Sequence, residues 1–220
     1  VEAALAPLAS YDADGTFAEL PEEVRARTRA AIEGLRGAFS ARPDAAVLEH
    51  HLDVLEQGVR TFVDPLQRDA AMAKNVDWLV HHYAGSRVVL SMHDSHASRR
   101  GFADYQLGRM LARAYGDDYV VIGTGFAHGR LRALGEDPSR GNQVFDTGAP
   151  EPDSLDAAMA LASAPVFAVD LRRADGPVGA WLDGPMTAWS IGFRFVDAKA
   201  ATIPLVPKRA FDLLVFAKEV

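Results

Sequence analysis

The sequence predicts an α/β protein with a mostly parallel sheet, flanking helices and an N-terminal helical segment. Before residue 85, apolar residues recur at helical spacing. After it, short apolar runs alternate with helical ones, which is typical of strand–helix–strand units. The run at 87–92 contains consecutive valines and leucine, as in a strand buried on both faces. We therefore expect a helical, insertion-like or lid-like segment at 1–84 and an α/β portion at 85–220.

Three helices are expected in the first part. Pro21, Glu22 and Glu23 suit a first helical turn, because proline has the required φ and acidic groups face the positive end of the helix dipole. A second helical run includes residues 47–55, and a third covers about 64–82.

The second part alternates between strands and helices. A helix at 101–115 should end at Gly116, and another should begin after Ser154 and run to Ala162. The expected strands are 87–92, 119–123, 143–145, 165–170, 189–195 and 211–217.

Composition excludes several classes of function. The formal net charge of −7 argues against a nucleic-acid binder, which needs a basic surface. No apolar run reaches the roughly 18–20 residues that span a membrane. With no cysteine in 220 residues, disulfides, thiolate nucleophiles and cysteine-ligated zinc are excluded. No Gly-x-Ser-x-Gly motif supplies a serine nucleophile. These features, with no signal peptide, favour the cytoplasm, although the chain opens on Val and not Met.

The stretch VVLSMHDSHAS at 88–98 is the leading candidate site. His93, Asp94 and His96 directly follow an expected strand, and ligands of α/β proteins gather at the carboxyl ends of strands. Three interpretations stay open: a hydrogen-bonded loop pair, a metal site, or imidazoles that transfer protons or stabilise an oxyanion.

The third expected helix carries polar residues on an apolar stripe. Arg68 and Asn75 share that stripe with Met72 and Leu79, so Arg68 needs a carboxylate partner, such as Asp69, or a wet cavity.

The stretch GTGFAHG at 123–129 has the spacing GxGxxxG, which does not match a dinucleotide loop. Within this stretch, His128 either lines the same sheet edge as the histidine loop or lies in solvent.

Several stretches together resemble the erythromycin esterase family. The matching stretches, in order from about residue 60, are RDAAMAKNVDWLV (68–80), MHDSHAS (92–98), LGRMLARAYGDDYVVIGTGF (107–126), PEPDSLDAAMA (150–160) and FDLLVFAKEV (211–220). The resemblance implies hydrolysis of a macrolide or related lactone by activated water, without a covalent serine ester. It also implies a role in antibiotic resistance or secondary metabolism, with a macrolide or polyketide-like small molecule as the partner.

The resemblance also implies roles for individual residues. His93 and His96 occupy the positions of the family's active-site loop histidines. Substrate binding or support of the site is expected from the remaining candidates, Arg68, Asp69, Asn75, Asp94 and His128. No cofactor is implied, and a divalent metal is left open.

Two departures from the family pattern matter. Asp94 stands where the family has Asn, and Ser91-Met92 stands where it has Trp-Ala. The family's N-terminal half, with a Gly-Glu-x-x-His-Gly motif and a histidine base, has no counterpart here, so we expect the base in a missing N-terminal half of the same protein. Two alternatives follow: a relative repurposed for cyclisation, dehydration or isomerisation, and a non-catalytic binding or resistance module.

Overall fold

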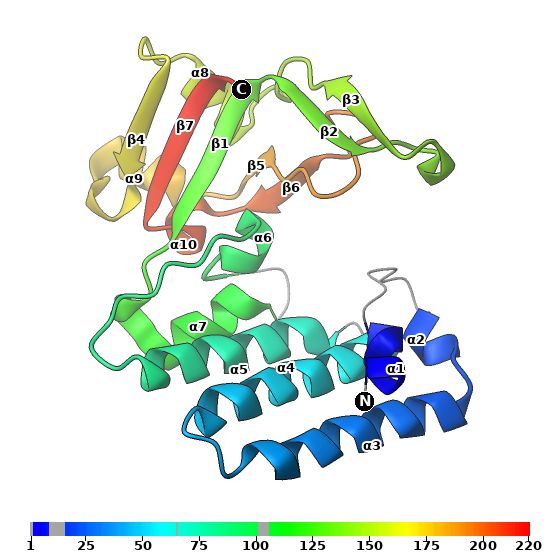
Figure 1. Ribbon diagram of the computed structural model, residues 1–220. Coiled ribbons are helices and arrows are strands. Elements are labelled where there is room, and N and C mark those ends of the chain that lie inside the picture. Colours follow the sequence, from blue (N-terminus) through cyan, green and yellow to red (C-terminus); the bar gives the residue numbers. More distant parts are fainter. Residues whose placement is uncertain (1, 9–15, 65, 101–105) are drawn as a thin grey trace. The chain divides into compact units, whose positions relative to one another are not determined.

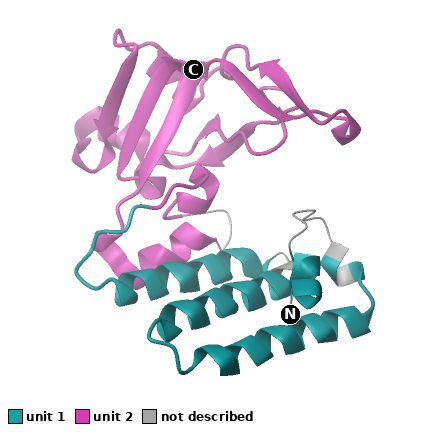
Figure 2. Cartoon of the chain, in the orientation of Figure 1, with its two compact units in different colours: residues 1–89 teal, residues 90–220 magenta. Residues whose placement is uncertain are grey.

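The computed structural model describes residues 2–8, 16–64, 66–100 and 106–220. The chain divides into two compact units, Val1–Val89 and Leu90–Val220 (Figure 2). In the described part of the chain, no helix is long and apolar enough to cross a membrane.

The first unit is helical (Figure 1). Its helices are α1 (Glu2–Leu5), α2 (Thr16–Glu19), α3 (Glu22–Phe39), α4 (Ala45–Val63) and α5 (Gln67–His82). The three expected helices are confirmed as α3, α4 and α5, and Pro21 stands directly before α3.

Apolar side chains of α2, α3 and α4 form the core of this unit. Phe17, Ile32, Leu52 and Val59 are all at most 3% exposed. The buried Thr28 of α3 donates through Oγ1 to the carbonyl oxygen of Ala4 at 2.8 Å, which ties α1 to the bundle.

The second unit mixes strands with short helices (Figure 1). Its helices are α6 (Asp94–Ala97), α7 (Leu107–Tyr115), α8 (Leu155–Ala160), α9 (Gly176–Leu182) and α10 (Pro207–Ala210). Its strands are β1 (Ile122–His128), β2 (Arg130–Leu134), β3 (Asn142–Asp146), β4 (Val166–Asp170), β5 (Met186–Trp189), β6 (Thr202–Leu205) and β7 (Leu213–Glu219).

The sheets of this unit are mixed, which corrects the expectation of a mostly parallel sheet. The order of the three-stranded sheet is β1-β7-β4, with β7 parallel to β1 and antiparallel to β4. Two antiparallel pairs, β2-β3 and β5-β6, complete the described strands. The last strand of the chain thus inserts between two earlier ones, and the α/β class is confirmed.

Most expected elements of this unit are present. Strands 143–145, 165–170 and 211–217 correspond to β3, β4 and β7. Gly116 ends α7 with a φ of 53°, and Ser154 caps α8 by accepting a hydrogen bond from the backbone of Ala157 at 3.1 Å. Of the helix expected at 101–115, residues 101–105 lie outside the described residues.

Three strand predictions need correction. Residues 87–92 form no strand, because no described strand pairs with them, and Val89 is 92% exposed. The strand expected at 119–123 begins only at Ile122, as β1. The strand expected at 189–195 is wrong, because β5 ends at Trp189 and the chain then turns towards β6.

The three-stranded sheet has one covered face and one open face. Leu214 and Phe216 of β7 are buried on the covered face, where α8 packs against β1. On the open face, Ile122, Val166 and Val215 are 56%, 63% and 37% exposed. The open face is therefore apolar and uncovered within this unit.

A partly buried ion pair fixes the segment after α6. The Arg99 guanidinium lies 3.0 Å from Oδ2 of Asp212, the residue before β7, and it also bonds the carbonyl oxygen of Tyr119. Asp212 Oδ2 in turn accepts a hydrogen bond from the backbone of Val121 at 2.7 Å. One carboxylate thus joins the starts of β1 and β7 to the loop that follows α6.

Replacing Asp212 with alanine should lower the free energy of unfolding by about 3 kcal/mol, because Arg99 and the Val121 N–H both lose their acceptor. Chemical denaturation measures this loss. The matched control is Asp183→Ala. It breaks an ion pair with Arg209 in which both side chains are about half exposed, so the free energy of unfolding should fall by no more than about 1 kcal/mol. Equal losses in the two variants would contradict the assigned role of Asp212.

Candidate functional site

His93 caps the N-terminus of α6. Its backbone is extended (φ −65°, ψ 140°), and its Nδ1 accepts hydrogen bonds from the Ser95 backbone N–H at 3.2 Å and the Ser95 hydroxyl at 2.7 Å. Its Nε2 lies 3.0 Å from the carbonyl oxygen of Ile191. Because Nδ1 is an acceptor, Nε2 carries the hydrogen and donates it to Ile191. Both ring nitrogens are therefore engaged, and the ring holds α6 against the segment after β5.

Asp94 is the first residue of α6, and its side chain reaches β1. Its Oδ2 accepts hydrogen bonds from the Thr124 backbone N–H at 2.9 Å and from the Thr124 hydroxyl at 3.4 Å. No described residue donates to its second oxygen, Oδ1. Burial raises the pKa of the Asp94 carboxyl, and the Thr124 donors and nearby His93 offset this only in part.

Asp156 lies in the first turn of α8 and is 3% exposed. Its Oδ2 accepts a hydrogen bond from the Trp189 backbone N–H at 2.7 Å. Burial, together with the nearby negative charge of Asp94, raises the pKa of Asp156 to about 6, against the effect of the Trp189 and Phe126 N–H groups. The two carboxyl groups are thus close enough to repel each other.

The two carboxylates accept hydrogen bonds that a neighbouring strand would otherwise accept. β1 is an edge strand, so its N–H groups on the side away from β7 have no strand partner. Thr124 donates to Asp94 on this side, and Phe126, two residues on, lies beside Asp156. Strand-edge donors need acceptors, and the two acidic side chains supply them, at the exposed Thr124 and at the partly buried Phe126.

Two glycines of β1 leave room for this arrangement. A Cβ at Gly125 would lie 3.0 Å from Oδ1 of Asp156, and a Cβ at Gly123 would lie 2.7 Å from the ring of Phe211. The glycines of the GTGFAHG stretch therefore permit close packing against β1.

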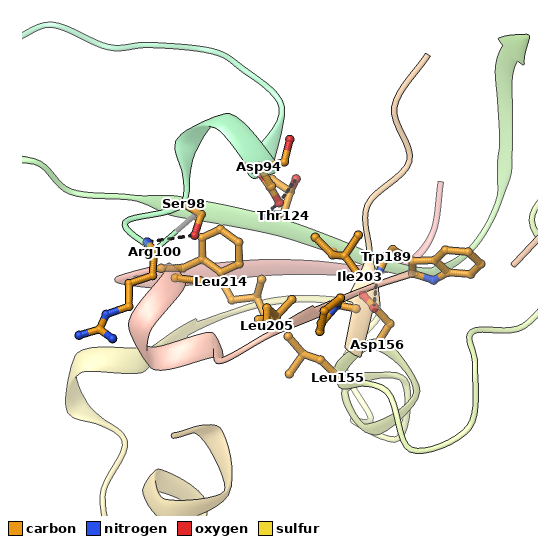
Figure 3. Close-up of a pocket in the computed structure, with 16 residues that line it drawn as sticks. Asp94, Ser98, Arg100, Thr124, Leu155, Asp156, Trp189, Ile203, Leu205 and Leu214 are labelled. Carbon is orange, nitrogen blue, oxygen red and sulfur yellow. Dashed lines mark hydrogen bonds between the residues drawn. The ribbon is translucent and has the colours of Figure 1, made fainter. Parts of the chain in front are cut away.

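A small cavity lies beside the two carboxylates, and we call it the inner cavity. Its volume is about 40 Å³. Figure 3 shows Asp94 beside Thr124, Asp156 beside Trp189, and Arg100 at the far end. The remaining walls are mostly apolar and come from β5, β6, α10 and β7, with Ala188, Ile203, Leu205, Ala210 and Leu214.

A larger, more open hollow adjoins it, and we call it the outer groove. It has a volume of about 370 Å³ and crosses the open face of the sheet. Its walls are Met92, His93, Asp94, Thr124, Gly125, Phe126, Trp189, Ser190, Ile191, Val215, Ala217 and Val220. Asp94, Thr124, Gly125 and Trp189 line both hollows and so form the wall between them.

The structure brings together only part of the predicted site. His93 and Asp94 line the outer groove, whereas His96, on the same short helix, is not among the described residues that line either hollow. His128 is exposed at the end of β1.

Arg68, Asp69 and Asn75 lie on α5 of the other unit. Arg68 is exposed, which corrects the expectation that it interrupts a buried stripe, because it stands in the first turn of the helix. Asp69 is 6% exposed, and the Oδ1 atom of Asn75 is buried with no hydrogen-bond donor among the described residues.

Within the described ranges, no three His, Asp or Glu side chains lie close enough together to hold a metal ion.

Sequence reasoning missed Asp156 and Trp189. Asp156 follows a helix cap and looks like an ordinary acidic residue of a first turn, so its position under β1 has no signal in the sequence. Trp189 is 8% exposed and stacks on Phe126 with ring centroids 5.8 Å apart, and its indole N–H has no acceptor among the described residues.

Comparisons with known proteins identify one family and a shared fold. A model of the erythromycin esterase family matches residues 6–220. A crystal structure of a protein from Bacillus cereus is similar with a TM-score of 0.81 and 21% identity, and the match covers 100% of this chain and 58% of the other. A succinoglycan biosynthesis protein is similar with a TM-score of 0.80 and 15% identity, covering 99% and 56%. No curated protein matches the chain.

Asp156 should make the protein less stable as the pH rises from about 4 to 6. Its pKa is about 6 in the folded state and about 3.9 when unfolded, so the folded protein holds the extra proton in this window. The stabilisation is complete below about pH 4 and is lost above about pH 6, a change of about 2–3 kcal/mol. Denaturant unfolding at several pH values, with Asp156→Asn as the reference, measures it.

The control for this measurement is Asp137→Asn. The Ser139 hydroxyl and backbone N–H lower the pKa of the exposed Asp137, so its contribution to stability has the opposite sign and is lost as the pH falls. A difference between the parent and Asp156→Asn that is constant from pH 4 to 7 would contradict the assignment.

Proposed function

The chain belongs to the erythromycin esterase family, and from this membership we propose that it hydrolyses a carboxylic ester, with macrolides and related lactones as the substrate class. The observation that supports this most is a family match over residues 6–220 in a chain whose groove carries His93 and Asp94. The chain spans 58% and 56% of the lengths of the two similar structures, so activity is proposed for the whole protein.

The composition of the outer groove supports an ester of low polarity. Phe126, Ile191 and Val215 provide apolar walls, and His93 and Asp94 are the ionisable groups. A volume of about 370 Å³ suits the ester-bearing part of a larger molecule. Ligand sites of this kind combine apolar walls with a few polar groups that orient the ligand.

The proposed reaction is a direct attack by water on the acyl carbon. The oxygen of water forms a bond to the carbonyl carbon, the carbonyl oxygen becomes an oxyanion, and the bond to the alcohol oxygen breaks when the intermediate collapses. From its place in the family's loop motif, and not from the lining of the groove, we assign His96 as a donor to the oxyanion in the whole protein. His93 is the residue that positions α6 and therefore Asp94. No serine ester forms, in keeping with the missing Gly-x-Ser-x-Gly motif.

We further propose that a missing N-terminal half of the same protein covers the open sheet face. Ile122, Val166 and Val215 are more exposed than a stable soluble sheet usually leaves such residues. The partial coverage of both similar structures supports additional chain in this protein. The family's histidine base and the support residues of α5, Arg68, Asp69 and Asn75, belong to the same proposal.

The full-length gene product should open a macrolactone such as erythromycin in ¹⁸O-labelled water and give a hydroxy acid with one ¹⁸O in its carboxyl group. Mass spectrometry of the product measures the label. A converted product without ¹⁸O indicates cyclisation, dehydration or isomerisation, and binding without turnover indicates a binding module. Either result would refute hydrolysis.

His96→Ala should lower turnover at least about 100-fold with an unchanged melting temperature. His93→Ala should lower both turnover and stability, the latter by about 1 kcal/mol, because α6 loses its cap. Parent-like turnover in both variants would remove the histidines from the proposed site.

Val166→Lys should lower the melting temperature of the full-length gene product, because a covered sheet face cannot accommodate an unpaired charge. The matched control is Val178→Lys on α9, where valine is 59% exposed and lies outside the sheet. An equal, small effect of both substitutions would mean that the sheet face remains open.

A further inference from the structure

The wall between the two hollows contains one ionisable side chain, Asp94. Of its two oxygens, Oδ2 is held by Thr124, whereas Oδ1 accepts no hydrogen bond from the described residues. The carboxylate is therefore fixed in position and keeps one oxygen available for a further donor.

The inner cavity has the size of a water site. A buried water needs about 10–15 Å³ of accessible space and two or more polar partners, so about 40 Å³ holds roughly two or three waters and excludes an organic substrate. Asp94, Asp156 and the hydroxyl of Ser98 provide polar partners along its walls. The outer groove, on the other side of Asp94, is large enough for an ester group.

We propose that the inner cavity supplies the water for hydrolysis and that Asp94 is the base that activates it, which rests on the proposed ester hydrolysis. The water lies at Oδ1 of Asp94, between the inner cavity and the ester in the outer groove. Asp94 would then provide, within this chain, the base that is otherwise expected in another part of the protein.

The proton balance of the step is complete. Asp94 takes one proton from water while the water oxygen bonds to the acyl carbon. When the intermediate collapses, the bond from carbon to the alcohol oxygen breaks, and Asp94 gives that proton to the leaving alkoxide. The remaining proton stays with the new carboxylic acid, which releases it to solvent at neutral pH.

The charged surroundings of Asp94 suit a base. His93 lies on its own element, Asp156 approaches from α8, and Arg100 lines the far end of the inner cavity. β1 and β5 contribute neutral groups, Thr124 and Trp189. Burial raises the pKa of the Asp94 carboxyl, which makes it a stronger proton acceptor than a solvated aspartate.

Asp94→Asn in the full-length gene product is the decisive variant. Asparagine has the same shape, and its carbonyl oxygen can still accept from Thr124, so a purely structural role predicts parent-like activity. Loss of the base predicts a 100- to 10,000-fold lower kcat with little change in KM. A parent-like kcat, with hydrolysis by the parent established, would overturn the proposal while leaving the proposed function intact.

Asp156→Asn provides a second readout. Ionised Asp94 raises the pKa of Asp156, so the parent should show an additional step in the pH profile of kcat/KM that Asp156→Asn removes. Identical profiles in the two proteins would contradict the coupling of this pair.

The source of the water is tested with Ala188→Val, which adds two methyl groups to a wall of the inner cavity. We expect a lower kcat at an unchanged KM in a variant that unfolds cooperatively. NMR magnetisation transfer from long-lived waters to the methyl groups of Ala188 and Ala210 in the parent protein is independent of any variant. A cavity without water in the parent protein, or a parent-like kcat in Ala188→Val, would overturn this part of the proposal.

Discussion

The unpaired edge of β1 is the constraint on which the second unit depends. A strand edge without a neighbouring strand leaves N–H groups that need acceptors, and β1 has a strand neighbour only on the side of β7. Side chains from two helices supply the acceptors, Asp94 at the start of α6 and Asp156 in the first turn of α8. Each helix is thereby fixed against the strand by a carboxylate. The same requirement brings two negative groups together in a region with little solvent, which raises the pKa of both.

The surrounding packing allows two carboxylates to lie side by side despite the cost in free energy. Glycine at position 125 lets the Asp156 carboxylate approach the backbone, and any larger residue would push against it. Arg99 and Asp212 hold the loop after α6 to the starts of β1 and β7, while His93 bonds the segment after β5. Asp94 is therefore positioned from both sides. Arg99 and Asp212, which line neither hollow, contribute to this positioning.

Local sequence patterns predicted the helices and caps, which depend on neighbouring residues. They failed for structure that depends on a partner far away in the chain. The helices α3, α4 and α5 follow from apolar periodicity, and the α8 cap at Ser154 follows from one hydroxyl. Residues 87–92 have every local property of a buried strand, but a strand also needs a neighbour, and no described strand pairs with them. The loop at 93–96 was found from its histidines. Asp156 was not, because its burial depends on a strand edge about 30 residues earlier in the chain, and nothing in its own neighbourhood signals this.

A hydrolase must bring water to an acyl carbon while it keeps bulk solvent from the leaving group. A carboxylate in a wall between an apolar groove and a cavity of water size suits both needs, since the inner cavity is too small for an ester and the outer groove is large enough for one. Burial raises the pKa of the Asp94 carboxyl and so opposes its ionisation. The Thr124 N–H counteracts this by stabilising the ionised form through one oxygen, which leaves the other oxygen to accept the proton. The same backbone donor that required an acceptor along β1 thus keeps that acceptor usable as a base.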